Sequence, residues 1–155
     1  MPHPGQLHLV VPTCVIVRDG QVLILKRGAH EIAYPGKWTI PGGKVDRAEY
    51  ESTPKHNRDA WGSILETTLR REIAEEAGIE IDEPHYIGSY AFIRPDGYAV
   101  IGINYWATWK SGEVAISNDF DAVAWIDPAR VGEYEMVEGL DTLIARVPQL
   151  VGVPT

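Results

Sequence analysis

The sequence has little cysteine and no surplus of positive charge. Cys14 is the only cysteine among 155 residues, so the chain cannot form an intramolecular disulfide or a two-cysteine metal site. Cys14 lies in an apolar run, where a buried strand position is expected. With 14 Lys and Arg against 22 Asp and Glu, the formal net charge is −8, which opposes non-specific attraction to nucleic acid or to an anionic membrane.

Long apolar runs are missing as well, and we expect no leader segment. No window approaches the ~20 apolar residues of a membrane helix, and the first residues lack the basic start of a signal peptide. We therefore expect no nucleic-acid or membrane partner and a cytoplasmic location. The chain shows no repeat, and its 45% apolar and 23% charged residues are typical of one globular domain. Residues 1–155 are expected to form that single domain.

Several segments have the patterns of β-strands. Residues 7–17 and 22–25 are mostly apolar, and the turn 18–21 between them contains Asp-Gly, which predicts a β-hairpin. Residues 38–40 predict a short strand that runs into Pro41-Gly42-Gly43, where glycine permits close backbone approach. Further strands are predicted at 85–93, 98–109 and 122–126.

Two helices are predicted with their boundaries. Ser63, followed three residues later by Glu66, predicts a capping box that opens an amphipathic helix, and Gly78 predicts its end. Asp127-Pro128 starts further helical material. A closing helix is predicted from an apolar repeat at Leu140, Leu143, Ile144 and Val147. The polar stretch 44–61 is predicted to be a loop or insertion.

The helix that ends at Gly78 has an unfavourable charge pattern. Its last turn carries Glu75 and Glu76, where the helix dipole favours cations, and Glu72 lies one turn earlier, where like charges repel. At about 100° per residue, Glu76 falls inside the apolar arc. Carboxylates gathered at the edge of a buried face imply a raised pKa or a bound cation, and oxygen ligands suit Mg²⁺ or Mn²⁺. The non-functional alternative is a solvated acidic face.

These residues resemble a known family. Gly43, Glu49 and the run from Arg71 to Ile79 resemble the box of the Nudix hydrolases, G-x5-E-x7-R-E-U-x-E-E-x-G-U, where U is apolar. The second half matches at every defined position. The resemblance implies an α/β fold, the Nudix-type α/β/α sandwich around a mixed β-sheet. It also implies metal-dependent hydrolysis of the pyrophosphate bond of a nucleoside diphosphate linked to another moiety.

The spacing departs from that box. Arg71 lies 28 positions after Gly43, which is 14 more than the box allows, so an insertion is expected at about residues 46–61. If Glu49 is the box glutamate, the extra residues follow it. If the helix keeps its spacing, Ser63 takes that position, and Glu49 can fold back to supply the missing carboxylate. The insertion is either a lid over the substrate or a tolerated surface loop.

The resemblance implies a role for each candidate residue. The Gly42 carbonyl, Glu72, Glu75 and Glu76 would hold Mg²⁺ or Mn²⁺, and Arg71 would hold the helix carboxylates in place. Glu72 is the expected general base, with Asp119 or Asp121 as the competitor. Substrate contacts are expected from Arg27, Lys37, Trp38 and Gly43. The aromatic residues that could stack on a nucleoside are Tyr34, Trp38, Tyr90, Phe92, Tyr105 and Trp109.

Two functions remain open at the level of sequence. The first is a pyrophosphohydrolase acting on a small nucleotide-type diphosphate such as a nucleoside triphosphate, ADP-ribose or a sugar nucleotide. The second is a non-catalytic nucleotide-sensing module that keeps the fold. The three retained glutamates favour the first, because a sensor has no need of mutually repelling carboxylates. The sequence selects no substrate, and it leaves the oligomeric state open, with a homodimer as one alternative.

Overall fold

The sheet starts with the antiparallel hairpin that the sequence predicts. The computed structural model describes residues 1–151, and after a short 3₁₀ turn, η1 (Pro4–Gln6), it places strand β1 at Leu9–Arg18 and strand β2 at Gln21–Arg27. Asp19 and Gly20, between the strands, both have positive φ, at 50° and 77°. Such a pair matches the right-handed twist of the hairpin, so the Asp-Gly prediction is confirmed.

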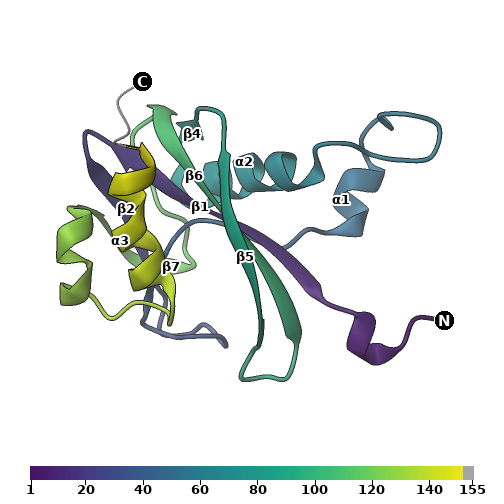
Figure 1. Cartoon of the computed structure of the whole chain (residues 1–155), viewed down its shortest axis with the longest axis horizontal. Helices are drawn as coiled ribbons and strands as arrows, with labels where there is room; N and C mark the ends of the chain where they lie inside the picture. The colour runs from purple at the N-terminus through teal and green to yellow at the C-terminus, as the bar shows by residue number, and fades with distance from the viewer. Residues whose placement is uncertain (152–155) are drawn as a thin grey trace.

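The other strands extend this hairpin into a mixed sheet (Figure 1). Strand β6 runs parallel to β1, and every other pairing is antiparallel: β1 with β2, β2 with β3 and β7, and β6 with β4 and β5. The expected strands are therefore present, with small shifts of their ends. Their bounds are Trp38–Thr39 for β3, Glu80–Ile81 for β4, His85–Ile93 for β5, Ala99–Ser111 for β6 and Phe120–Ile126 for β7.

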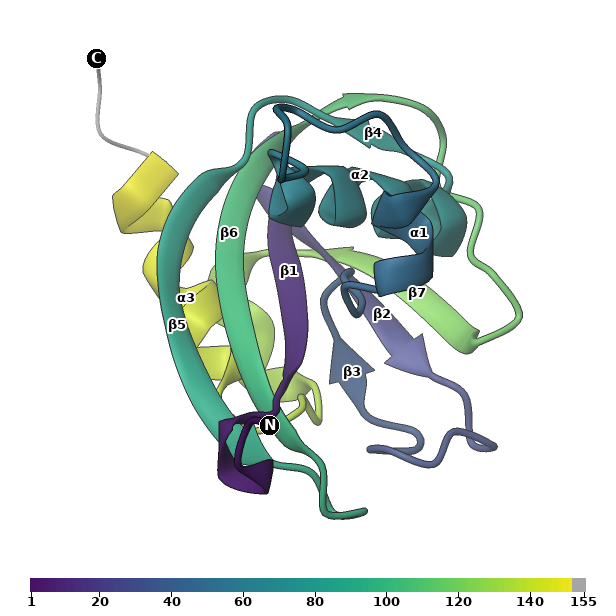
Figure 2. The same cartoon turned by 90° about the vertical axis from the view of Figure 1, so that its right-hand side faces the viewer.

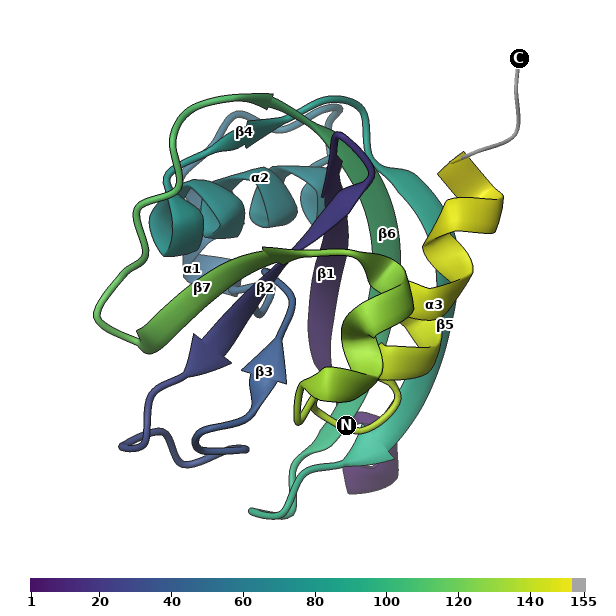
Figure 3. The same ribbon diagram turned by 90° about the vertical axis from the view of Figure 1, so that its left-hand side faces the viewer.

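Helices cover both faces of this sheet (Figures 2 and 3). Helix α2 (Ile64–Ala77) and helix α3 (Leu140–Val151) lie on opposite sides. Alternate residues of β1 divide between the two cores: Cys14 and Ile16 pack toward α2, and Val15 and Val17 pack toward α3. The α/β/α layering is confirmed, and Cys14 is fully buried as predicted.

Helix α2 begins where the sequence predicts, but by a different mechanism. Ser63 has φ 53° and ψ 36°, and its side chain accepts no capping hydrogen bond. The capping-box prediction is wrong because a side-chain cap requires an extended backbone at that residue. At the other end Gly78 has φ 70° and its N–H donates to the Ala74 carbonyl, so the predicted left-handed end is confirmed.

The stretch predicted as a loop, residues 44–61, contains a short helix. Helix α1 spans Arg47–Glu51, and its N-cap Asp46 accepts a hydrogen bond of 2.9 Å from the Ala48 N–H. The prediction of an irregular loop is therefore wrong for these five residues. Beyond α1, the indole N–H of Trp61 donates to the Thr53 carbonyl at 2.9 Å, and this bond closes the remaining loop at its stem.

The C-terminal part follows the sequence prediction closely. Asp127 accepts a hydrogen bond from the Ala129 N–H at the start of a 3₁₀ helix, η2 (Pro128–Glu133). The four apolar positions predicted for the closing helix are buried in α3: Leu140, Leu143, Ile144 and Val147. Within residues 1–151, the structure contains no helix of the length and apolarity that crossing a bilayer requires.

Replacing Ile144 by Ala tests how α3 is held to the sheet. Ile144 is fully buried in the core between α3 and β1, and such a truncation costs about 2–5 kcal/mol because a cavity remains. Urea unfolding of Ile144→Ala is expected to show that loss with an unchanged m-value. Arg146→Ala, on the exposed face of the same helix, is the control and is expected to change stability by less than about 0.5 kcal/mol. Equal losses would contradict this packing.

Candidate active site

The turn after β3 runs between strand β1 and helix α2. Its backbone bonds to β1: the Cys14 N–H donates to the Pro41 carbonyl at 2.9 Å, and the Gly43 N–H donates to the Pro12 carbonyl at 3.2 Å. A Cβ on Gly42 would overlap the Pro12 carbonyl, and one on Gly43 would overlap the Glu72 carboxyl group. Glycine is therefore required at position 42, and a side chain at position 43 would displace the Glu72 carboxyl group. The close contact places the Glu72 carboxylate directly against the turn.

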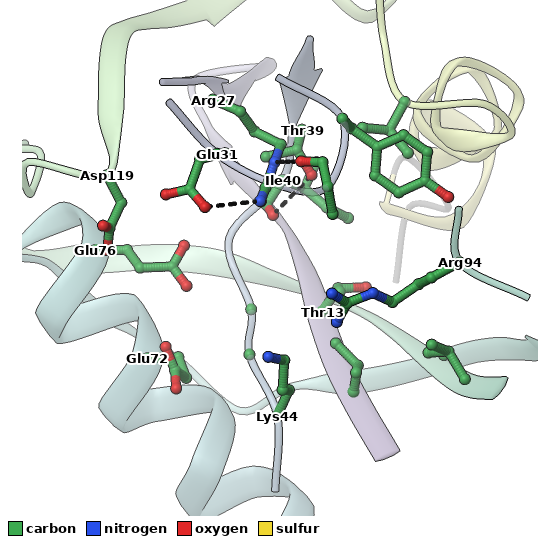
Figure 4. Close-up of a pocket in the computed structure, with 18 of the residues that line it drawn as sticks. Thr13, Arg27, Glu31, Thr39, Ile40, Lys44, Glu72, Glu76, Arg94 and Asp119 are labelled. Carbon is green, nitrogen blue, oxygen red and sulfur yellow. Dashed lines mark hydrogen bonds and ion pairs between the residues drawn. The ribbon is translucent and has the colours of Figure 1, made fainter. Parts of the chain in front are cut away.

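Two glutamates of α2 face the cleft beside this turn. Glu72 and Glu76 lie one helical turn apart and point toward the open space in Figure 4. The Glu72 side chain is 19% exposed, whereas that of Glu75 is 60% exposed. The expected group of three therefore divides into two carboxylates at the edge of the core and one at the rim.

Glu76 is in an environment that disfavours its charged form. Burial raises the pKa of Glu76 to about 9, and the neighbouring Glu72 adds to the rise, while the Gly42 backbone and Arg27 act in the opposite direction. A carboxylate in such a position is stabilised either by a proton or by a cation. This agrees with the expectation that the apolar arc of the helix contains Glu76.

Arg71 connects three carboxylates. Its two terminal nitrogens donate to Glu72 at 2.8 Å and to Glu75 at 2.7 Å, and its Nε forms an ion pair of 2.6 Å with Glu49. Partial burial acts to lower the pKa of Arg71, but the three carboxylates outweigh it and hold that pKa above its usual range. Because Glu49 comes from α1, the ion pair places α1 beside the site.

These groups form one end of a cleft of about 800 Å³. Arg27 lies at another side, where its guanidinium donates to the Ala33 carbonyl and to Glu31. The cleft also contains three aromatic residues that the sequence singled out, namely Tyr34, Tyr90 and Phe92. The other three do not line it: Trp38 packs on Tyr134, Tyr105 is buried, and the ring of Trp109 lies under Arg18.

The structure brings most of the expected site residues together. The cleft is lined by Arg27, Gly42, Gly43, Glu49, Arg71, Glu72, Glu75, Glu76 and Asp119. Three others lie elsewhere: Lys37 borders a separate shallow depression, Trp38 packs in the core beside α3, and Asp121 accepts a bond from the Ala29 N–H. Lys37 was expected to contact substrate because it flanks the first loop, and Trp38 because its ring could stack on a nucleoside, but neither residue lines the cleft. Ser63 does not line the cleft.

Sequence reasoning missed four charged residues of the cleft, namely Glu31, Lys44, Asp46 and Arg94. Lys44 directly follows the Gly42-Gly43 turn, and this position could have identified it as a cleft residue from the sequence. Arg94 lies near the tip of the β5–β6 hairpin, far from the box in sequence, and only the strand pairing brings it to the cleft. Glu31 forms its ion pair with Arg27 at 3.3 Å.

Comparison with known proteins identifies the family of this chain. The model of the NUDIX domain matches residues 7–147. The chain belongs to the Nudix family. The resemblance stated from the box is therefore confirmed, together with the α/β fold and the class of enzyme, a Nudix pyrophosphohydrolase. Members of this family typically depend on a divalent metal ion.

This Nudix protein is similar in sequence to several named proteins. Nucleoside triphosphatase NudI of Escherichia coli (strain K12 / DH10B) is 26% identical over 132 residues, which cover 79% of this chain and 84% of that protein. A MutT-like protein of Streptomyces ambofaciens is 28% identical over 128 residues, or 82% and 69% of the two chains.

Solved structures show the same fold. The MutT NUDIX hydrolase from Burkholderia pseudomallei superposes with a TM-score of 0.70 at 25% identity, over 91% of this chain and 98% of the other. The NUDIX domain of Shewanella oneidensis NrtR, complexed with ADP ribose, gives a TM-score of 0.70 at 19% identity, over 94% and 89%.

The buried carboxylate makes the stability of the metal-free protein depend on pH. An unfolded glutamate releases its proton near pH 4.5, whereas folded Glu76 keeps its proton until about pH 9. Between these values the folded state holds more protons, so its stability falls as pH rises. In EDTA at about pH 8, Glu76→Gln is expected to raise Tm by at least about 3 °C and to flatten the decline of Tm with pH.

Glu75→Gln is the matched control for this experiment, because it makes the same change one residue earlier on an exposed side chain. Its Tm is expected to follow the slope of the wild type. A wild-type Tm that does not fall between about pH 5 and 9, or a Glu76→Gln variant with the wild-type slope, would contradict the environment described for Glu76.

Proposed function

We propose that this Nudix protein hydrolyses the pyrophosphate bond of a nucleoside diphosphate linked to another moiety, with Mg²⁺ or Mn²⁺ as its cofactor. The observation that carries the proposal is the pair Glu72 and Glu76, held at the edge of the core beside the Gly42-Gly43 turn. Such a pair destabilises the fold unless a cation compensates it.

The donor set fits a hard divalent cation. Glu72, Glu75, Glu76 and the Gly42 carbonyl supply only oxygen, which is the ligand type that Mg²⁺ and Mn²⁺ prefer. The raised pKa of Glu76, caused first by burial, marks a place where a positive charge is missing. A bound divalent ion would neutralise the diphosphate and polarise its phosphoryl oxygens. This would allow a protein with a net charge of −8 to bind an anion.

The remaining roles belong to side chains of the cleft. We assign Glu72 as the general base that accepts the proton of the attacking water, with Asp119 as the competitor across the cleft. Arg71 is a positioning residue, because its guanidinium fixes the carboxylates of Glu72 and Glu75. Glu49 completes that set through its ion pair with Arg71, so we propose that it takes the place of the box glutamate.

This assignment explains how an insertion can be tolerated. In this proposal the extra residues lie within 46–61. After α1 the chain leads away from the site in a loop, which the hydrogen bond between Trp61 and Thr53 closes at its base. Loop closure adds little cost for a segment of this length. Arg27 and Gly43 line the cleft and remain proposed substrate contacts, whereas Lys37 and Trp38 are not proposed.

The substrate class follows from the relatives and from the shape of the cleft. Two kinds of relative are a nucleoside triphosphatase and a Nudix domain complexed with ADP ribose. Both ligand types contain a diphosphate and a nucleoside. The lining of the cleft includes the acidic groups of α2 and the aromatic residues Tyr90 and Phe92. We therefore propose a nucleotide-type substrate and favour nucleoside triphosphates.

The test is ³¹P NMR of the purified protein with nucleoside triphosphates, ADP-ribose, sugar nucleotides and dinucleoside polyphosphates, in Mg²⁺ and in EDTA. We expect at least one of them to yield a nucleoside monophosphate in Mg²⁺ only. Glu72→Gln is expected to lower kcat by at least about 100-fold, because it removes a proton acceptor. Glu138→Gln, which lies just before α3 and outside the cleft, is the control and should keep wild-type kcat.

Two results would contradict the proposal. Hydrolysis that persists in EDTA would exclude the metal site. Tight binding of a nucleotide without any turnover, in folded wild-type protein with Mg²⁺, would favour the alternative of a nucleotide-sensing module.

A further inference from the structure

Arg94 is a charged group of the cleft that the proposed hydrolysis does not use. It follows β5 and lies at the turn between β5 and β6, where its backbone N–H donates to the Tyr98 carbonyl at 2.9 Å. Its side chain is 16% exposed. Figure 4 shows the guanidinium reaching into the cleft from the side opposite Glu72 and Glu76. The hairpin therefore holds a partly buried cation on the side of the cleft away from the acidic helix.

Asp96 fixes this guanidinium in one orientation. Arg94 Nε donates to one carboxylate oxygen of Asp96 at 3.0 Å, and Nη2 donates to the other at 2.6 Å. This side-on pair is bidentate, so it compensates the charge and locks the plane of the group. The end of the guanidinium keeps two parallel N–H donors, one on each terminal nitrogen. A neutral group with two adjacent acceptors suits these two donors best, because Asp96 already compensates the positive charge of Arg94.

Two aromatic side chains precede Arg94 at alternate positions of the chain, so they lie on the same face of the strand. Tyr90 and Phe92 come from the same strand and also line the cleft, with their ring centroids 5.6 Å apart and their planes at 26°. Tyr90 packs over Gly102 of the neighbouring strand, where a Cβ would come within 3.1 Å of the ring. Flat aromatic surfaces of this kind stack nucleobases of any identity. A base stacked here would still need a directional contact to distinguish it from the other bases.

Lys44 is a second cation of the cleft, and it differs from Arg94. In Figure 4 its amine lies between Arg94 and the glutamates of α2. Among residues 1–151 it forms no ion pair, and it is exposed. An uncompensated ammonium suits phosphate oxygens as a point charge. The two cations thus divide the cleft into a part that binds phosphate and a part that binds an uncharged group.

We propose that Arg94, oriented by Asp96, recognises the edge of the nucleobase and favours bases with two adjacent acceptors. Guanine offers O6 and N7, and cytosine offers N3 and O2. Adenine places an amino donor beside each acceptor of its N6 edge, and uracil separates its two carbonyls with an N–H. The preferred substrates are therefore guanine and cytosine nucleotides. This inference rests on the proposed nucleotide substrate and adds the choice of base.

The experiment is isothermal titration of the full chain with GMP, CMP, AMP and UMP in Mg²⁺. Wild-type protein is expected to bind GMP and CMP at least about tenfold more tightly than AMP and UMP, which is the discrimination typical of a bidentate arginine. In Arg94→Lys the ratio is expected to fall below about threefold, because an ammonium lacks the two parallel donors. The affinity for AMP and UMP is expected to change little.

The chain offers a matched control. Arg130 forms the same bidentate pair with Glu133, with contacts of 2.5 Å and 3.0 Å, but it lies on η2 and does not line the cleft. Arg130→Lys should keep the wild-type ratio. Asp96→Asn provides a second variant: it keeps the donors but removes their orientation and the compensating charge. We expect it to bind all four monophosphates more tightly and to distinguish them less.

The inference is overturned by a wild-type ratio below about threefold or by no binding of any monophosphate. It is also overturned if Arg94→Lys weakens all four ligands equally, because Arg94 would then contact phosphate or ribose. These results are separable from the proposed function. Hydrolysis without base preference overturns only the role of Arg94, and base preference without hydrolysis overturns only the reaction.

Discussion

The site depends on one close approach, that of the Gly42-Gly43 turn to strand β1 and to the Glu72 carboxylate. Hydrogen bonds to the backbone of β1 hold the turn in place, and the missing side chains let α2 come against it. Any side chain at either position would separate the helix from the sheet or displace the carboxylate. The mixed sheet and its two cores serve this arrangement, because they fix the distance between β1 and α2.

The close approach of the turn to α2 also places the negative charges of Glu72 and Glu76 at the edge of the core. Helix α2 carries its glutamates at the end where its dipole favours cations. Arg71 pairs with Glu72 and Glu75, whereas Glu76 forms no ion pair within residues 1–151. Burial raises the pKa of Glu76, so the metal-free fold is less stable than a neutral side chain would make it. Residues that lower stability at a cleft are expected where a ligand restores it.

The sequence predicts the elements that follow local rules. Asp19-Gly20 defines the first hairpin, Gly78 ends α2, and the apolar repeat defines α3, since each signal acts within a few residues. The box supplies the helix glutamates. Predictions that depend on tertiary structure were less accurate. Ser63 has a left-handed backbone and forms no cap, and Trp38 packs in the core and does not line the cleft. Arg94 was missed because only the pairing of β5 with β6 brings it to the cleft. Glu49 is near Arg71 because α1 folds back, which spacing alone leaves undecided.

The most direct test of the central claim is a Mn²⁺ titration, followed by electron paramagnetic resonance, of Gly43→Ala without substrate. A Cβ on Gly43 would overlap the Glu72 carboxyl group, whereas one on Gly132 meets nothing within 4 Å. The account predicts that Gly43→Ala binds Mn²⁺ at least about tenfold more weakly than wild type, equivalent to about 1.4 kcal/mol, while Gly132→Ala binds it normally. Wild-type affinity in folded Gly43→Ala would contradict the claim that this turn and the α2 glutamates form one cation site.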